Sequence, residues 1–298
     1  MIFFFFLAAS LPYEQLSDLY HPTIEDYRTI QQFLAEGERP ELRRMGDKEF
    51  LAREFRLVGK SPEEVPESGR VVVNCEESER ENCIIIYSSF NERYPRGLKR
   101  LVDVIAHSNF KGHVYYRIGG WPNTEEGDLL LAHVPFAFKP CFFREMQKMG
   151  YKHVLWLDAS ILPSPFVSLN KIFKMIAERK CFIQGNTHTL GPYMNEEAAH
   201  AFGLTLEETY AIPSCSAAIL GLDLTDSKAA SVIDAWYQAA QDPDAFYSPR
   251  SDQSALSIIL YQKGFRNFLP PSSLGERQFL DKDHNALFFM DRGYVKDR

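Results

Sequence analysis

Short apolar runs alternate with helix-like stretches along the chain from about residue 70 onward. Four of these runs are the length of a buried strand and have branched or aromatic side chains at their centres: residues 83–87, 113–116, 154–157 and 181–183. The segments between them have apolar residues at helical spacing, as in residues 98–105, where they recur at i, i+3, i+4 and i+7. This alternation predicts an α/β fold, with a parallel sheet and helices on both of its faces.

The second half of the chain is less regular. Thr205 and Glu208 have the spacing of a capping box, which marks the start of a helix. Residues 217–220 indicate a further strand and residues 287–290 a late one. Apolar spacing predicts two more helices, one over residues 232–240 and one that begins at Ser251 or Asp252.

The first part of the chain differs in character from the rest. Residues 13–68 are polar and helix-prone, and the stretch 61–67, which contains two prolines, is the best candidate linker. We therefore expect two parts: an apolar N-terminus with a helical lead-in over residues 1–69, and the α/β domain over residues 70–298.

The N-terminal residues 2–9 are an unbroken apolar run. They resemble the core of a short secretory signal, with Ala8 and Ser10 as small residues before a cleavage point, although no Lys or Arg precedes them. The alternative is a buried strand or an apolar cap on the first helix. The sequence therefore leaves open whether the protein is cytoplasmic or exported. No later run approaches the roughly 18 apolar residues of a membrane span, so we expect none.

Charge and cysteine spacing exclude several classes of function. Acidic residues outnumber Lys and Arg by 40 to 33, which gives a net charge of −7. Nonspecific binding of nucleic acid needs a cationic surface, so we expect no nucleic-acid partner. The five cysteines contain no CxxC pair, which excludes a zinc knuckle or a thioredoxin-like motif, and the eight histidines lack HExxH spacing.

The most informative string is Val-Leu-Trp-Leu-Asp-Ala-Ser at residues 154–160. Asp158 ends an apolar strand, and Ser160 follows at i+2, so both side chains point the same way at the carboxyl edge of the sheet, where ligands bind. Two such oxygens suit Mg²⁺ or Mn²⁺, which could bridge the phosphates of a nucleotide and neutralise a departing diphosphate. The alternative is that Asp158 only caps the following turn.

This string resembles the DxD element of GT-A glycosyltransferases, and the resemblance extends over roughly residues 82–292. It implies a GT-A (Rossmann-like) fold with a mixed, mostly parallel sheet, and transfer of a hexosyl or related group. It also implies a nucleotide-sugar donor, a divalent cation (Mn²⁺ or Mg²⁺), and an acceptor that is a glycan, a protein or a small molecule. Position 160 departs from the family, since Ser replaces the usual second Asp. A neutral hydroxyl is a poorer ligand, which leaves three options: weak metal binding, binding only with the nucleotide present, or metal independence.

The same resemblance assigns roles to individual residues, nearest to the retaining galactosyltransferase and glycogenin-like group. The residues implied to bind the donor or line the acceptor side are Tyr87, Ser88, Ser89, Lys139, Ser214 and Ser216. Asn186 is a further candidate, because it lies in the polar segment 184–188 just past a predicted strand. The residues implied to act in catalysis are Asp252 and Gln253, and those implied to bind the metal are Asp158, Ser160 and His284. The Asp-Gln pair favours retention of the anomeric configuration without settling it.

Several of these residues also have a plainer interpretation. Lys139 before a proline is compatible with a solvated side chain, and Asp252 with a helix N-cap that accepts backbone hydrogen bonds. Gln253 either orients the acceptor hydroxyl, stabilises positive charge at the anomeric carbon, or is a surface amide. The segment 184–188 is either a sugar-contacting loop or an ordinary turn.

Two other functions compete with transfer. A degenerate GT-A domain would bind a nucleotide or glycan without turnover, which the missing second Asp makes a real alternative. A haloacid-dehalogenase-like phosphatase also places an Asp after an apolar strand, but its mechanism needs a second acid two residues later, and Ser160 is not one.

Overall fold

The computed structural model describes residues 67–88, 94–118, 131, 136–242, 244–246 and 248–292. The predicted N-terminal lead-in lies almost entirely outside these residues, so the boundary at residue 69 stays a prediction. In the described part of the chain, no helix is both long enough and apolar enough to cross a membrane.

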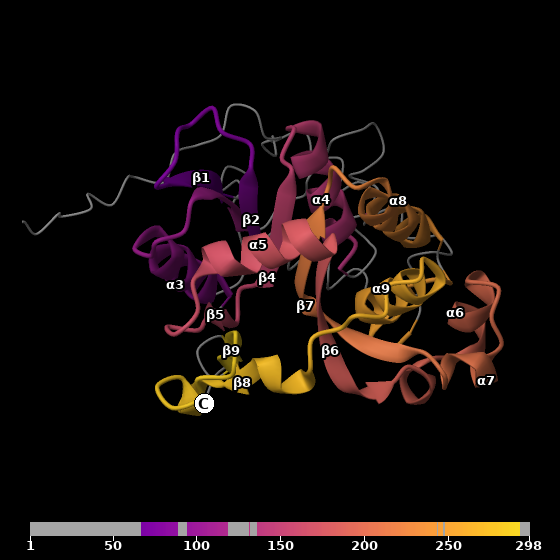
Figure 1. Cartoon of the computed structure of the whole chain (residues 1–298). Helices are drawn as coiled ribbons and strands as arrows, with labels where there is room; N and C mark the ends of the chain where they lie inside the picture. The colour runs from indigo at the N-terminus through magenta and orange to yellow at the C-terminus, as the bar shows by residue number, and fades with distance from the viewer. Residues whose placement is uncertain are drawn as a thin grey trace, which may run out of the picture.

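A six-stranded mixed sheet forms the centre of the protein (Figure 1). Its strands are β1 (Glu67–Val73), β2 (Asn82–Ser88), β3 (Gly112–Ile118), β4 (His153–Asp158), β6 (Cys181–Thr189) and β7 (Pro213–Asp223), in the order β1-β3-β2-β4-β7-β6. Strand β2 is parallel to β3 and β4, whereas β1 is antiparallel to β3, and β7 is antiparallel to both β4 and β6. The predicted mixed α/β sheet is confirmed: β2, β3, β4 and β6 run in the same direction, although three of the five strand pairings are antiparallel.

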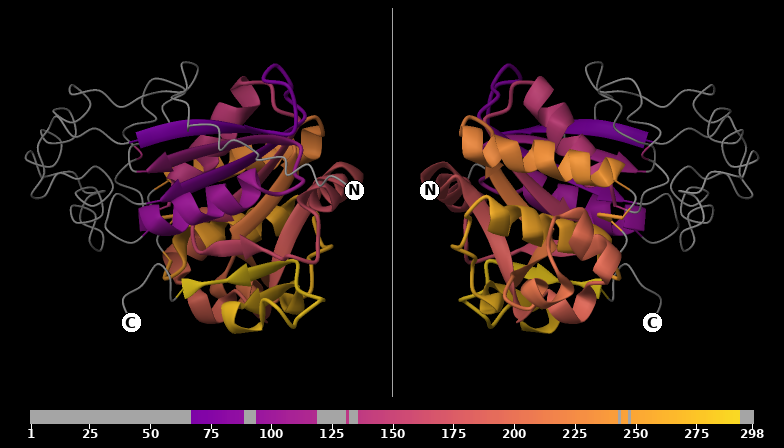
Figure 2. Two further views of the ribbon diagram at one scale, coloured as in Figure 1. Left: turned by 90° about the vertical axis from the view of Figure 1, so that its left-hand side faces the viewer. Right: turned by 90° about the vertical axis from the view of Figure 1, so that its right-hand side faces the viewer.

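Helices cover both faces of this sheet (Figure 2). One face packs against α3 (Tyr94–Ala106) and α5 (Leu169–Arg179), and the other against α4 (Phe138–Lys148), α8 (Ser227–Gln241) and α9 (Ser251–Gln262). Side chains alternate between the two layers, since Ile84 and Ile86 join the first and Cys83 and Ile85 the second. Burial on both faces is the reason that the strand sequences are continuous apolar runs.

Smaller elements complete the described fold. The second sheet has the order β5-β9-β8, formed by β5 (Ile161–Pro163), β8 (Leu274–Glu276) and β9 (Phe288–Met290). The short helices are η3 (Gly191–Tyr193), α6 (Glu196–Ala201), α7 (Leu206–Thr209), η4 (Pro271–Ser273) and η5 (Arg277–Phe279). The predicted capping box of Thr205 and Glu208 is confirmed at the start of α7. The predicted late strand is β9, which pairs with β5 in the second sheet.

The centre of the large sheet has no room for a side chain at Gly221 in β7. A Cβ built there would lie 2.5 Å from Cδ1 of Ile176 in α5 and 3.0 Å from Cβ of Phe182 in β6. We expect Gly221→Ala to lower the free energy of unfolding by about 1–3 kcal/mol, as overpacking of a core does. The measurement is urea unfolding at equilibrium.

The control is a double-mutant cycle with Ile176→Val, which removes the Cδ1 atom that the new methyl group would strike. Alone, this change should cost about 0.5–1.5 kcal/mol. The double variant should be more stable than the sum of the two losses predicts. The valine keeps the γ-carbon that lies 2.7 Å from the built Cβ, so we expect only partial rescue. Strictly additive losses would show that the contact with Cδ1 of Ile176 is not what excludes a side chain at this position.

Candidate active site

The ammonium group of Lys139 lies between two carboxylates that the sequence analysis had singled out. Its Nζ is 2.8 Å from Oδ2 of Asp252 and 3.4 Å from Oδ1 of Asp158. It also donates a hydrogen bond of 2.9 Å to the carbonyl of Ala217. Four elements, α4, β4, β7 and α9, therefore converge on a single buried cation.

The start of α4 aims this lysine inward. Pro140 lies in the first turn, where a helix tolerates proline because the missing N–H would have no partner inside the helix. Phe136, just before the helix, has a φ of 66°, which is uncommon for a bulky residue. Its half-exposed ring is centred 5.6 Å from Nζ of Lys139, and the Trp156 ring is centred 5.4 Å away. Both rings add cation–π attraction to the two ion pairs.

The electrostatics of this cluster keep the lysine charged. Burial alone would lower the pKa of Lys139, but Asp158 and Asp252 outweigh it, so the pKa is raised above its ordinary value. Burial raises the pKa of Asp252, and the neighbouring ammonium opposes that rise. Removing Lys139 from this cluster would leave two carboxylates without their cation, which is strongly destabilising.

Asp158 is the member of the cluster that faces solvent. Its side chain is 35% exposed, compared with 5% for Lys139. It ends β4 directly beside Tyr87 of β2, as the strand-end rule predicts. Oδ1 accepts a hydrogen bond of 2.7 Å from Nε1 of Trp156. In the described part of the chain its carboxylate accepts nothing from the following turn, so the simple turn-cap interpretation is not what the structure has.

Gln253, which follows Asp252 in the first turn of α9, belongs to a second polar group. Its Nε2 is 3.3 Å from the hydroxyl of Ser214, which also accepts a hydrogen bond of 3.0 Å from Nδ2 of Asn186. The hydroxyl of Ser257 donates to the Gln253 carbonyl and accepts from the backbone N–H of Cys215. These contacts fasten the start of α9 to the first residues of β7.

The same turn decides between the two interpretations of Asp252. The N-cap of α9 is Arg250, and Asp252 lies inside the first turn of the helix. Its carboxylate contacts Lys139 from α4. Asp252 is therefore part of the buried ion cluster and does not cap the helix.

The remaining residues predicted to bind the donor are Tyr87, Ser88, Ser89 and Ser216, and their contacts do not indicate a role. Tyr87 is buried at the end of β2, with its ring centred 4.1 Å from that of Phe138. Ser88 follows it, and its buried hydroxyl has no hydrogen-bond partner among the described residues. Ser89 lies outside the described residues. The hydroxyl of Ser216 accepts a hydrogen bond from the N–H of Ala218 in its own strand.

The three predicted metal ligands are in two different places. Asp158 and Ser160 flank one residue in the turn between β4 and β5. His284 is exposed, and its ring stacks on that of Phe166 at 3.9 Å, with no described hydrogen bond or ion pair to the other two. Among the described residues, no three His, Cys, Asp or Glu side chains gather as a metal-binding group. The three-ligand set stays a prediction.

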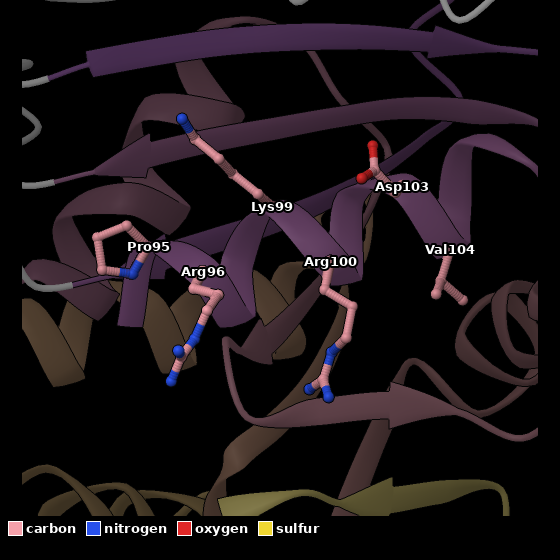
Figure 3. Close-up of a pocket in the computed structure, with 6 residues that line it drawn as sticks. All are labelled: Pro95, Arg96, Lys99, Arg100, Asp103 and Val104. Atoms are coloured by element: carbon pink, nitrogen blue, oxygen red, sulfur yellow. The ribbon is translucent and has the colours of Figure 1, made fainter. Parts of the chain in front are cut away.

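An open hollow lies along the outer side of α3 (Figure 3). It is lined by Pro95, Arg96, Lys99, Arg100, Asp103 and Val104, none of which is a predicted site residue. Figure 3 shows Arg96 and Arg100 pointing to the opposite side of the helix from Lys99. Arg100 pairs at 2.6 Å with Asp291, whose N–H binds the carbonyl of Ser160. This helix therefore supports the turn after Asp158, but its hollow is not the predicted site.

The hydrogen bond between Trp156 and Asp158 was not predicted, although the spacing of the two residues indicates it. Trp156 precedes Asp158 at i−2 in a strand, so the two side chains lie on the same face and can form a hydrogen bond. The pairing of Lys139 with Asp252 had no such signal, because the two residues lie on helices far apart in the sequence.

Comparisons with known proteins find similarity only to solved structures, and at low identity. No protein-family model and no curated protein matches the chain. A similar solved structure is that of a glycosyltransferase involved in the glycosylation of the major capsid of PBCV-1, at 13% identity over 72% of this chain and 96% of that chain, with a TM-score of 0.44. Another is apo mouse xyloside xylosyltransferase 1, at 9% identity over 69% and 74% of the two chains, with a TM-score of 0.35. With TM-scores below 0.5, these two similarities identify neither a family nor a donor, acceptor or activity.

Proposed function

We propose that the protein is a glycosyltransferase that moves a sugar from a nucleotide-diphosphate donor to an acceptor hydroxyl. The observation that carries this proposal is the Lys139 ammonium, held by Asp158 and Asp252 where β4 ends. A fixed cation beside a partly exposed carboxylate suits a substrate that has negative phosphates next to a carbon that becomes positive. Electrostatic stabilisation by preorganised groups is commonly the largest contribution to such catalysis.

In the transfer, the bond between the anomeric carbon and the diphosphate oxygen breaks, and both electrons leave on the diphosphate. The acceptor oxygen forms the new bond to this carbon, and its proton passes to the departing phosphate. Lys139 offsets the charge that grows on the leaving group. Asp252 holds the lysine in place, and the Gln253 amide, anchored on Ser214, orients the acceptor hydroxyl.

Asp158 and Ser160 would hold the divalent cation that the fold family implies. In the described part of the chain the ion pair and the hydrogen bond of the Asp158 carboxylate both use Oδ1, so Oδ2 has no hydrogen bond there. One carboxylate oxygen and one hydroxyl fit Mg²⁺ or Mn²⁺ when phosphate oxygens and water complete the shell. When bound, such a cation would neutralise charge on the departing diphosphate.

Release of nucleoside diphosphate tests the proposal directly. The full chain is incubated with a panel of UDP- and GDP-sugars and Mn²⁺, and we expect at least one donor to be consumed. Nucleotide binding without release from any donor would contradict transfer, and would support the alternative of a domain that binds nucleotide or glycan without turnover.

Of the predicted metal ligands, Asp158 should contribute more to donor turnover than Ser160. We expect Asp158→Asn to lower kcat/KM for donor turnover by about 10²- to 10³-fold, as the loss of one strong electrostatic contact does. Ser160→Ala should cost only about tenfold, because the hydroxyl brings no formal charge to the cation. Each variant is assayed over a Mn²⁺ titration, with Asp281→Asn, an exposed acid, as the control. Equal losses, or a dispensable Asp158, would contradict this assignment.

The lysine should be needed both for stability and for turnover. Lys139→Met leaves two carboxylates without their cation, so we expect the free energy of unfolding to fall by about 3–5 kcal/mol, together with donor turnover. Lys174→Met, which changes an exposed lysine of α5, is the control.

A second variant separates the two effects. Lys139→Met with Asp252→Asn removes one of the buried charges, and should regain part of the lost stability while donor turnover stays low. Recovery of turnover in this double variant would show that Lys139 only stabilises the fold.

A further inference from the structure

A cation and two rings lie together at the end of β6. The guanidinium carbon of Arg250 is 3.9 Å from the centre of the Tyr193 ring, and Nη1 is 3.2 Å from Nε2 of His188. The rings of His188 and Tyr193 are centred 4.6 Å apart. All three side chains are partly exposed to solvent. We refer to these three residues as the Arg250 cluster.

The Arg250 cluster adjoins the polar group around Gln253. Arg250 is the N-cap of α9, immediately before the turn that carries Asp252 and Gln253. His188 follows Asn186 at i+2 in β6, and Asn186 shares the Ser214 hydroxyl with Gln253. The first turn of α9 therefore sends Asp252 toward the ion cluster of Lys139, while its neighbours contact the ends of β6 and β7.

Arg250 supplies an available charge in this cluster. Its described side-chain contacts are His188 and Tyr193, and no Asp or Glu of the described part of the chain pairs with it. Burial, and then the nearby guanidinium, lower the pKa of His188, which keeps that ring neutral at neutral pH. Stacking on Tyr193 fixes the plane of the guanidinium, whose fork of N–H donors matches a carboxylate or phosphate.

The net charge of the chain and the neighbours of Arg250 both favour binding of an anion at this cluster. The chain has a net charge of −7, so its overall field repels anions, and binding of an anion needs a local cation that is already oriented. An Arg that serves only to stabilise a fold is commonly paired with an acid, as Arg117 is with Glu145 in the interior of this protein. Arg250 instead contacts the imidazole of His188 and the phenol ring of Tyr193.

We propose that the Arg250 cluster is the acceptor site and that it takes an anionic saccharide, a sugar that carries a carboxylate or a phosphate. The inference rests on the proposed transfer function. The anionic group meets the guanidinium of Arg250, and a hydroxyl of the same sugar reaches the amide of Gln253. The donor lies on the other side of the turn, against Lys139 and Asp158.

A binding titration tests this without relying on turnover. The imidazole signals of His188 are followed by NMR in the full chain as D-glucuronate, glucose 6-phosphate or D-glucose is added. We expect saturable shifts with the two anionic sugars and none with glucose, which differs from glucuronate only at the charged group. A response to glucuronate or to the phosphate alone identifies which anion is preferred. Equal responses to glucuronate and glucose would overturn the proposal.

Matched variants show whether the arginine is responsible. Arg250→Gln should weaken glucuronate binding by about tenfold or more, and Arg250→Lys should recover only part of it, because a lysine lacks the planar fork. The control is Arg266→Gln: Arg266 also stacks on a tyrosine at 3.9 Å, but just beyond the far end of α9. Thermal unfolding confirms that each variant is folded. Unchanged binding in folded Arg250→Gln would also overturn the proposal.

Measuring the release of nucleoside diphosphate with and without the sugars tests this inference separately from the proposed function. In the wild-type chain we expect glucuronate or glucose 6-phosphate, but not glucose, to raise release of nucleoside diphosphate above the rate of donor hydrolysis. If donors are hydrolysed but no anionic sugar binds or stimulates, the acceptor assignment fails and the transferase proposal stands. If no donor is consumed, the transferase proposal fails, and with it the role as acceptor site, while the titration still decides whether the cluster binds anionic sugars.

Discussion

One buried ammonium group ties the candidate site to the fold. Removing a lysine from water costs several kcal/mol, and Lys139 is stable in its charged form only because two carboxylates and a carbonyl surround it. Those partners come from β4, α9 and β7, while the lysine comes from α4. The helices α4 and α9 are therefore held in a fixed relation to the end of β4, and any group bound at Asp158 meets a preorganised charge.

The direction of β7 explains how these partners meet. Because β7 is antiparallel to β4 and Leu157 pairs with Ile219, the residues before Ile219 extend past the carboxyl end of β4. Strand β6 accompanies this extension, with Gly185 opposite Cys215. The pair forms a wall beyond the strand end, from which the Ala217 carbonyl reaches Lys139.

The sequence pattern predicted the strands that contain an apolar run and missed those that are very short or begin with polar residues. Apolar runs are typical of central strands, and they located β2, β3, β4, β9, the start of β6 and part of β7. Strand β1 was missed because four polar or small residues precede its three valines, and because it begins inside the stretch taken as a linker. Strands β5 and β8 have three residues each, too few for any periodicity. Hydrophobic periodicity also carries no information on direction, so the antiparallel insertion of β7 was not predictable from it.

Some residues of the candidate site were also predictable from the local sequence, whereas the contacts between them were not. Asp158 was predictable because the strand-end rule is local, whereas its ion pair with Lys139 and that of Lys139 with Asp252 depend on how distant helices pack. The Arg250 cluster gave a signal at one residue only. His188 belongs to the segment 184–188, which the sequence predicts as a sugar-contacting loop or a turn but which lies in strand β6, whereas Tyr193 and Arg250 have no unusual sequence context.

The charges of the central cluster also give a physical meaning to Ser160. Two carboxylates and one ammonium sum to a single negative charge, and an acid at position 160 would raise this to two within one turn of the chain. A site with two negative charges would repel the donor diphosphate unless a cation were bound first. With Ser160 this repulsion would be smaller, and the nearby ammonium of Lys139 would attract phosphate. Under the proposed function, the serine would therefore favour an order in which the nucleotide and the cation bind together, each supplying charge that the other needs.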